Sequence, residues 1–162
     1  MISIALVEPE IPQNTGNIAR LCAATNTSLH IVGVPGFRLD DRAVRRAGLD
    51  YWPEVALTRH RDVAALYHAM TDARFIYLTT QAELPYFQWR FETRDCLVFG
   101  RETKGLPEDV LRGNRDRCLT IPMLNSKVRS LNLANTVAIV LYEALKQTGA
   151  FTEWRKPDSD PS

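Results

Sequence analysis

The chain has 162 residues, a formal net charge of +1 at pH 7 and 45% hydrophobic residues. These values are typical of one globular domain with its own core, and they exclude a largely disordered chain and any global basic field that would indicate a nucleic-acid partner. Arginine supplies 16 of the 20 basic residues. Its planar fork suits phosphate groups, but a coding bias toward arginine would give the same composition.

The cysteines and the apolar runs indicate in which cellular compartment the protein is expected. Cys22, Cys96 and Cys118 are odd in number and form no CxxC pair, which favours a reducing environment and indicates neither a disulfide framework nor a zinc site. We therefore expect no bound metal. Residues 1–10 lack the basic region and the long apolar run of a signal peptide, and the longest apolar run, at residues 137–142, is too short to cross a membrane. We expect a cytoplasmic protein with no membrane contact.

Strand and helix patterns alternate along the chain. Short apolar runs typical of buried parallel strands occupy residues 2–7, 29–34, 55–58, 74–80, 96–99 and 119–122. Helical patterns occupy residues 14–25, 37–46, 62–70, 108–112 and 131–145. This alternation predicts an α/β fold with a mainly parallel sheet and helices on both faces. With no internal repeat or linker, residues 1–150 are expected to form a single domain, followed by a polar, disordered tail at 151–162.

The last predicted helix is apolar on nearly every side. Ser130 is expected to be its N-cap, Gly149 to follow its end, and Glu143 is its only formal charge between residues 131 and 145. A helix that is hydrophobic all round has to be covered all round. One cover is the chain's own sheet, and we expect the other to be a second copy of the protein. A capped core helix without a ligand role is the alternative.

Polar side chains gather on two other helical segments. Asn14, Asn17 and Arg20 fan over one flank of the helix at 14–25, where they would either meet a ligand or form a solvated edge. At helical spacing, Arg38, Arg42 and Arg45 share a stripe, which is either a binding surface or a solvated charged face.

Ligands of parallel α/β sheets bind beyond the carboxyl ends of the strands. Three expected strand ends stand out, at residues 78–80, 100–102 and 121–123. The chain contains neither a GxGxxG fingerprint nor a P-loop, so a nucleotide-like ligand would have to be held by other means.

Three sequence blocks carry a resemblance to a known family. They are NTGNIARLC at residues 14–22, FGRETKGLP at 99–107, and IPML with RSLNLANTVAIVLYE between residues 121 and 143. In this order and at these spacings they resemble the three motifs of the SPOUT class of RNA methyltransferases. Residues 1–150 resemble most closely the YibK/TrmL-like group of tRNA wobble-nucleotide 2′-O-methyltransferases. The chain departs from the group at Arg101, where a proline often stands, and in the loop at residues 124–128.

The resemblance implies a C-terminal trefoil knot and S-adenosyl-L-methionine as cofactor. It implies transfer of a methyl group to the ribose of a cytidine or modified uridine at the wobble position, in the tRNA anticodon stem-loop. The apolar helix described above predicts that the enzyme is a homodimer formed through this C-terminal knot helix. Glycine would let main chain approach the cofactor closely. The cofactor-binding residues implied by motif are Leu78, Thr79, Gly100, Glu102, Gly105, Ile121, Met123, Ser130 and Leu131.

The resemblance also implies catalytic roles for Arg20, Asn14, Asn132 and Asn135. Because a guanidinium keeps its proton up to a pH of about 12, we expect Arg20 to hold phosphate and to stabilise the developing alkoxide, in trans on its partner's pocket, rather than to act as an unaided base. The RNA-binding residues are expected to be Arg38, Arg42, Arg45, Arg46, Arg129 and Tyr142. Two alternatives stay open: a SPOUT enzyme acting on another RNA such as rRNA, and a non-catalytic RNA-binding module.

Overall fold

A computed structural model describes residues 1–40, 42, 44, 46 and 51–155 of the chain. Arg45 and the end of the expected tail, residues 156–162, lie outside the described residues. The described strands are β1 (Ser3–Val7), β2 (Ser28–Val32), β3 (Leu57–His60), β4 (Arg74–Leu78), β5 (Asp95–Phe99) and β6 (Cys118–Leu119). The described helices are α1 (Pro12–Ala24), α3 (Val63–Ala69), α4 (Glu108–Arg112) and α5 (Leu133–Gln147).

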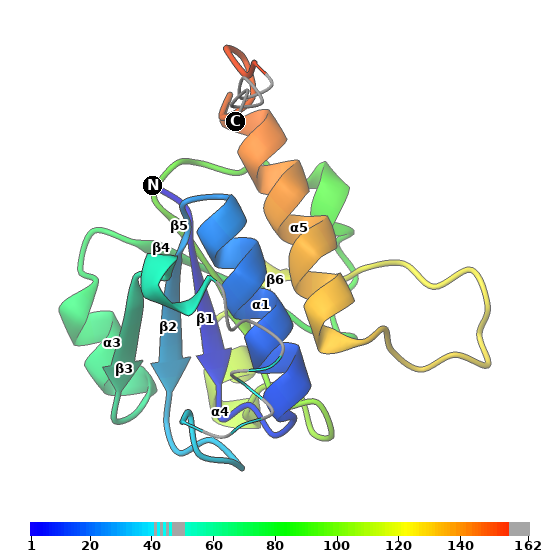
Figure 1. The fold of residues 1–162 in the computed structure, drawn as a ribbon. Coiled ribbons are helices and arrows are strands. Elements are labelled where there is room, and N and C mark those ends of the chain that lie inside the picture. Colours follow the sequence, from blue (N-terminus) through cyan, green and yellow to red (C-terminus); the bar gives the residue numbers. More distant parts are fainter. Residues whose placement is uncertain (41, 43, 45, 47–50, 156–162) are drawn as a thin grey trace.

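The strands form one parallel sheet. Their order is β3-β2-β1-β5-β4-β6, and every paired neighbour runs parallel (Figure 1). The predicted fold class is therefore confirmed. The chain adds strands outward from β1 to β3 and then crosses to the other side of β1, which makes the gap between the carboxyl ends of β1 and β5 the topological switch point.

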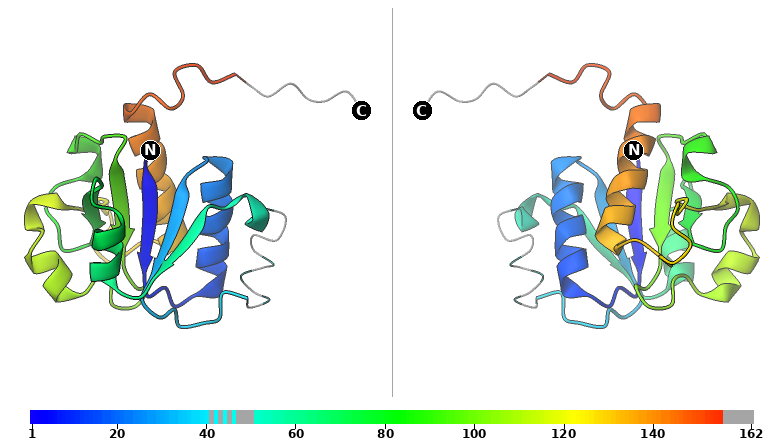
Figure 2. Two further views of the ribbon diagram at one scale, coloured as in Figure 1. Left: turned by 90° about the vertical axis from the view of Figure 1, so that its left-hand side faces the viewer. Right: turned by 90° about the vertical axis from the view of Figure 1, so that its right-hand side faces the viewer.

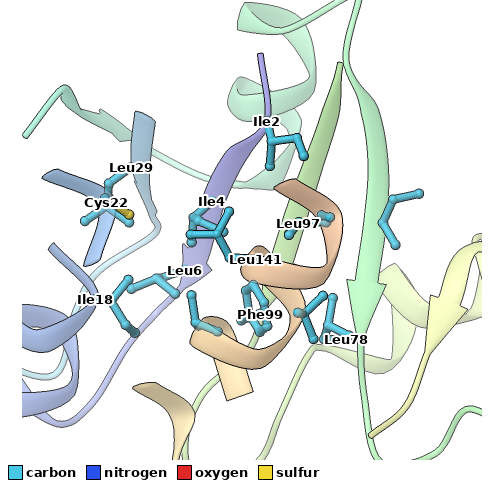
Figure 3. Packing of buried hydrophobic residues seen from close by; sticks show 14 of the residues in the cluster. Ile2, Ile4, Leu6, Ile18, Cys22, Leu29, Leu78, Leu97, Phe99 and Leu141 are labelled. Atoms are coloured by element: carbon cyan, nitrogen blue, oxygen red, sulfur yellow. The ribbon is translucent and has the colours of Figure 1, made fainter. Parts of the chain in front are cut away.

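Helices cover both faces of the sheet (Figure 2). On one face, α1 and α5 lie side by side, and their buried residues pack on inward-facing residues of the strands. Figure 3 shows Leu141 of α5 within this cluster, together with Ile4, Leu97 and Phe99 of the sheet. Complete burial of one such leucine contributes about 1.5–3 kcal/mol. On the opposite face, Leu66 of α3 and Leu111 of α4 belong to a second buried cluster.

The ends of α5 correct one prediction and confirm another. Asn132, not Ser130, is the N-cap, because its Oδ1 accepts hydrogen bonds from the backbone N–H of Ala134 at 2.9 Å and of Asn135 at 3.3 Å. At the other end, Gly149 has a φ of +78° just after the C-cap. It follows the helix as predicted, in the left-handed conformation that glycine adopts without strain.

Other boundaries shift by a few residues for local reasons. Helix α1 begins at Pro12 rather than at Asn14, since proline fits the first turn of a helix, where its missing N–H has no partner to lose. Strand β3 occupies Leu57–His60 rather than residues 55–58, because Val55 ends a 3-10 turn. No helix among the described residues is both long enough and apolar enough to span a membrane.

The segment between β6 and α5 stands out from the body of the molecule in Figure 1, where it is yellow. Residues 124–130 of this segment are exposed, and the side chain of Leu124 is completely so. The resemblance places a trefoil knot in this part of the chain, and the threading of that knot stays a prediction.

Candidate active site

Two adjoining cavities lie beyond the carboxyl ends of β4, β5 and β6. Their volumes are about 520 and 80 Å³, and both are lined by Leu78, Thr79, Ser130 and Leu131. The larger one is of the size that binds small molecules. Every residue predicted to bind the cofactor lines one or both of them; besides Leu78, Thr79, Ser130 and Leu131, these are Gly100, Glu102, Gly105, Ile121 and Met123.

The wall formed by the predicted glycines is a turn that closes on itself. The N–H of Arg101 donates to the carbonyl of Gly105 at 3.0 Å, and the N–H of Gly105 donates back to the carbonyl of Arg101 at 2.8 Å. A Cβ on Gly100 would lie 2.1 Å from the carbonyl carbon of Gly105, so glycine is needed at position 100 for the turn itself and not only for a ligand. Gly105 has a φ of +67° and an open face, with nothing within 4 Å of a Cβ built there.

A hydrogen-bonded chain of side chains joins three distant segments beside this turn. The amide Nδ2 of Asn132 donates to Oδ1 of Asn14 at 2.9 Å, and Nδ2 of Asn14 donates to Oε1 of Glu102 at 3.1 Å. The carboxylate of Glu102 also accepts the backbone N–H groups of Glu10 at 2.8 Å and Ile11 at 3.1 Å. Since Ile11, the N-cap of α1, offers no capping side chain, Glu102 supplies the negative charge that a helix N-terminus favours.

Two of the predicted catalytic residues therefore meet at the pocket and two do not. Asn14, which is 5% exposed, and Asn132 both line the larger cavity. Arg20 lines none of the described cavities, and its guanidinium carbon lies 4.9 Å from the ring centroid of Tyr51. Asn135 lines a separate groove between α1 and α5, which Asn132 also lines. Arg20 therefore does not line the pocket of its own chain.

The predicted RNA-binding residues are spread over several places. Arg129 is exposed and lines the larger cavity. Tyr142 is 48% exposed on the outer face of α5, where its ring stacks on Phe151. Arg42 and Arg46 are helical and exposed, whereas Arg38 precedes the helix and forms two hydrogen bonds with Asp40. The predicted helical stripe starting at Arg38 is wrong, because residues 39–40 form a turn.

Sequence reasoning missed a second set of contacts between the loops that follow β1 and β5. The guanidinium of Arg101 pairs with the carboxylate of Glu8, and the carboxylate of Glu10 accepts the backbone N–H and the hydroxyl of Thr103. The hydrogen bonds from Thr103 lower the pKa of Glu10, and the hydrogen bond to Glu8 raises the pKa of Arg101. The sequence signal that could have predicted these contacts is the pair Glu8 and Glu10, which follow the buried strand β1.

The cysteines take no part in the site. All three are free and buried, and burial raises the pKa of Cys22 and of Cys96 to about 12, so that both carry their proton at neutral pH. No group of three or more histidine, cysteine, aspartate or glutamate side chains that could hold a metal ion occurs in the part of the chain that the structure describes.

A parallel sheet with a glycine-walled pocket at its carboxyl edge defines an α/β protein whose candidate site lies where such sheets bind their ligands. Comparison with known families narrows this class. The model of the SpoU rRNA Methylase family matches residues 1–142. The chain belongs to this family.

Individual relatives align with this chain over nearly their whole length. A Bacillus subtilis protein with the proposed name tRNA (cytidine(34)-2′-O)-methyltransferase is 48% identical over 90% of this chain and 92% of its own length. The Escherichia coli tRNA (cytidine(34)-2′-O)-methyltransferase is 45% identical over 92% of this chain and 95% of its own length. A solved structure described as giving insight into 2-OH methylation of C/U34 on tRNA superposes with a TM-score of 0.86, at 44% identity over 91% of this chain and 95% of that one.

Proposed function

We propose that this protein transfers a methyl group from S-adenosyl-L-methionine to the ribose 2′-hydroxyl of the wobble nucleotide, cytidine or uridine 34, of tRNA. The observation that carries the proposal is the pocket at the carboxyl edge of the sheet, because residues from all three family motifs line it beside the Asn132–Asn14–Glu102 chain. Relatives at 45% and 48% identity bear the name of this activity.

The residues present fit the cofactor. The smaller cavity is lined by apolar side chains, among them Leu78, Ile121 and Met123, which suit the flat face of a purine, and the hydroxyls of Thr79 and Ser130 are at hand for polar edges. The open face of Gly105 lets main chain approach a ligand closely. When bound, S-adenosyl-L-methionine supplies a methyl group already activated on a sulfonium.

The task of the chain's own residues is then to align the 2′-hydroxyl and to stabilise charge. Asn14 and Asn132 are held by each other and by Glu102, so they form a fixed wall against which a ribose is oriented. Orientation of this kind removes a large entropic part of the barrier. Arg20 supplies a cation that holds the adjoining phosphate and stabilises the oxygen as it loses its proton.

Arg20 reaches the pocket from a second copy of the chain. Its position over Tyr51 leaves the pocket of its own chain without this cation, and the groove between α1 and α5 lies open beside Asn132. On the outer face of α5, Ile139 and Tyr142 are exposed apolar surface next to that groove. A two-fold contact through α1 and α5 would cover this surface and bring each Arg20 to its partner's pocket.

The RNA lies on the exposed cations at the mouth of the pocket. Arg129 lines the larger cavity, and we assign the exposed Arg42 and Arg46 to the same RNA-binding surface. Such contacts bind the phosphates of an anticodon stem-loop without reading its sequence. We place the whole activity in residues 1–150, as one domain acting in the cytoplasm.

The experiment is methyl transfer from labelled S-adenosyl-L-methionine to tRNA transcripts. The matched substrate carries a 2′-deoxyribose at position 34 and is otherwise identical. We expect label in the first transcript and none in the second. Equal labelling of both transcripts would show that nucleotide 34 is not the methylated position. Labelling of rRNA but not of tRNA would favour a SPOUT enzyme that acts on another RNA. Cofactor binding without transfer to any RNA would favour a non-catalytic RNA-binding module.

A further inference from the structure

We propose that the ion pair between Glu8 and Arg101 is a positioning device, which holds the cofactor turn at residues 100–105 in register with the N-terminus of α1. This inference rests on the proposed function, because it assigns the pair to the same cofactor pocket.

The ion pair links the two loops that follow the neighbouring strands β1 and β5. Strands β1 and β5 are neighbours, and their carboxyl ends form the topological switch point. The chain leaves β1 toward α1 on one face and leaves β5 toward α4 on the other. Loops that diverge in this way open a crevice for a ligand but do not hold each other. Contacts across the crevice are therefore required to set its width.

Glu8 is directed toward Arg101 by its own backbone. It has a φ of +48°, a left-handed conformation that is unfavourable for a non-glycine residue and persists only where the surroundings hold it. Its N–H donates to the carbonyl of Val32 at 2.8 Å, and its Cγ would lie 2.6 Å from a Cβ on Gly33. Gly33 thus leaves the space through which the carboxylate of Glu8 reaches the neighbouring loop.

Arg101 meets that carboxylate with a fork. Both Nε, at 2.7 Å, and Nη2 donate to Oε2 of Glu8, while the side chains keep 37% and 31% of their exposure. The backbone of Arg101 also closes the turn, because its N–H and its carbonyl each form a hydrogen bond with Gly105. The ion pair that fixes the guanidinium of Arg101 therefore also fixes the position of the pocket wall that contains Gly100 and Gly105.

A second tie keeps the turn folded if the first is removed. The carboxylate of Glu10 accepts the N–H of Thr103 at 3.0 Å and its hydroxyl at 2.8 and 3.0 Å, and Glu102 binds the N-terminus of α1 from the opposite side. Loss of the Glu8–Arg101 pair should therefore widen the crevice without unfolding the loop. Cofactor affinity is the quantity that such a change alters first.

The test is a double-mutant cycle on the full-length protein with Glu8→Gln, Arg101→Gln and both together. Calorimetry measures binding of S-adenosyl-L-methionine, steady-state kinetics separates KM for the cofactor from kcat, and thermal unfolding monitors the fold. We expect each single variant to raise Kd and KM about three- to tenfold, with kcat changed less than about twofold, and the double variant to be no worse than either single one. Arg61→Gln, which breaks an exposed arginine–aspartate pair at the start of α3, is the matched control and should change nothing.

Other outcomes overturn the inference. Single variants with unchanged Kd, or losses that add in the double variant, would show that the pair does not position the pocket. Arg101→Lys, which keeps the charge but not the two-pronged contact, should give an intermediate Kd if the fork matters. Failure of the wild-type protein to bind the cofactor would instead contradict the proposed function, so the two failures are distinguishable.

Discussion

Asn132 and Asn14 form a hydrogen bond of 2.9 Å across 118 residues of sequence, and this bond joins the N-cap of α5 to the first turn of α1. The same Asn132 side chain uses its oxygen to cap α5 and its nitrogen to hold Asn14. Helix stability and pocket geometry therefore depend on two different atoms of one amide.

This division predicts that stability and activity can be separated at position 132. Asn132→Ser keeps a capping oxygen but is too short to hold Asn14, so we expect stability within a few tenths of a kcal/mol of wild type and a loss of methyl transfer on the order of a hundredfold. Asn132→Ala should lose the activity and also about 1 kcal/mol of stability. Urea unfolding and single-turnover transfer measure the two effects. Equal activity of Asn132→Ser and wild type would contradict the role of the Asn14 bond.

The two glycines of the pocket turn should fail for different reasons. Gly100→Ala places a Cβ within 2.1 Å of backbone, so the turn cannot close and cofactor binding should be lost. Gly105→Ala meets no atom but keeps a φ of +67°, so we expect a cost of about 1–2 kcal/mol and weakened rather than abolished binding. Gly113→Ala, at a negative φ with open space around it, is the neutral control. Calorimetry that ranks the two pocket variants in the reverse order would refute this account.

Complementation between two inactive variants tests whether Arg20 acts in trans. Arg20→Ala should bind cofactor but not transfer methyl groups, and Gly100→Val should not bind cofactor. Co-expressed with different tags and purified as the heterodimer, the two chains should regain roughly half of wild-type activity, since one of the two equivalent sites is whole. A stable heterodimer without activity would show that Arg20 serves its own chain, and an active monomer would remove the need for a dimer.

Arg129 should contribute to RNA binding and not to cofactor binding. It is exposed at the rim of the cavity. Arg129→Ala is expected to weaken tRNA binding and to lower the slope of log affinity against log salt by about one, while leaving the calorimetric cofactor affinity unchanged. Arg112→Ala, an exposed cation on α4, is the control for charge alone. An unchanged salt slope in Arg129→Ala would remove this residue from the interface.

A buried histidine pair should make stability depend on pH. Nδ1 of His30 in β2 lies 2.9 Å from Nε2 of His60 in β3, and burial, reinforced by the charge of His60, lowers the pKa of His30 from 6.5 to about 4. Between pH 6.5 and about pH 4, His30 is protonated in the unfolded chain but neutral in the folded protein. The free energy of unfolding therefore falls as pH falls, by at most about 1.4 kcal/mol per pH unit.

Replacement of this histidine isolates its share of the pH dependence. His30→Gln should flatten the dependence between about pH 4 and pH 6.5, while the groups common to both proteins cancel in the comparison. Urea unfolding of both proteins across this range measures the two slopes. Parallel slopes for wild type and His30→Gln would show that His30 is not responsible.

Local patterns were sufficient for the elements that depend on neighbours in the sequence. Helix α4 and the strand cores of β1 and β5 follow from apolar residues and from glycine or proline near their ends, and β4 follows from its apolar run alone. The motif blocks were sufficient for the family and for the residues that line the pocket, because backbone loops at the carboxyl edge of a parallel sheet converge there.

Only the tertiary structure decided which groups bind one another. Glu102 lines the larger cavity, and its carboxylate also accepts hydrogen bonds from the N-terminus of α1; the bond from Glu10 spans 92 residues. Arg20, which we expect at the partner's pocket, lies over the ring of Tyr51 in its own chain. A side chain's partners depend on which strands become neighbours, and the crossing from β3 to β4 that places β5 beside β1 leaves no mark within any single stretch of sequence. Sequence therefore determined the parts of this site, and the order of the strands decided their contacts.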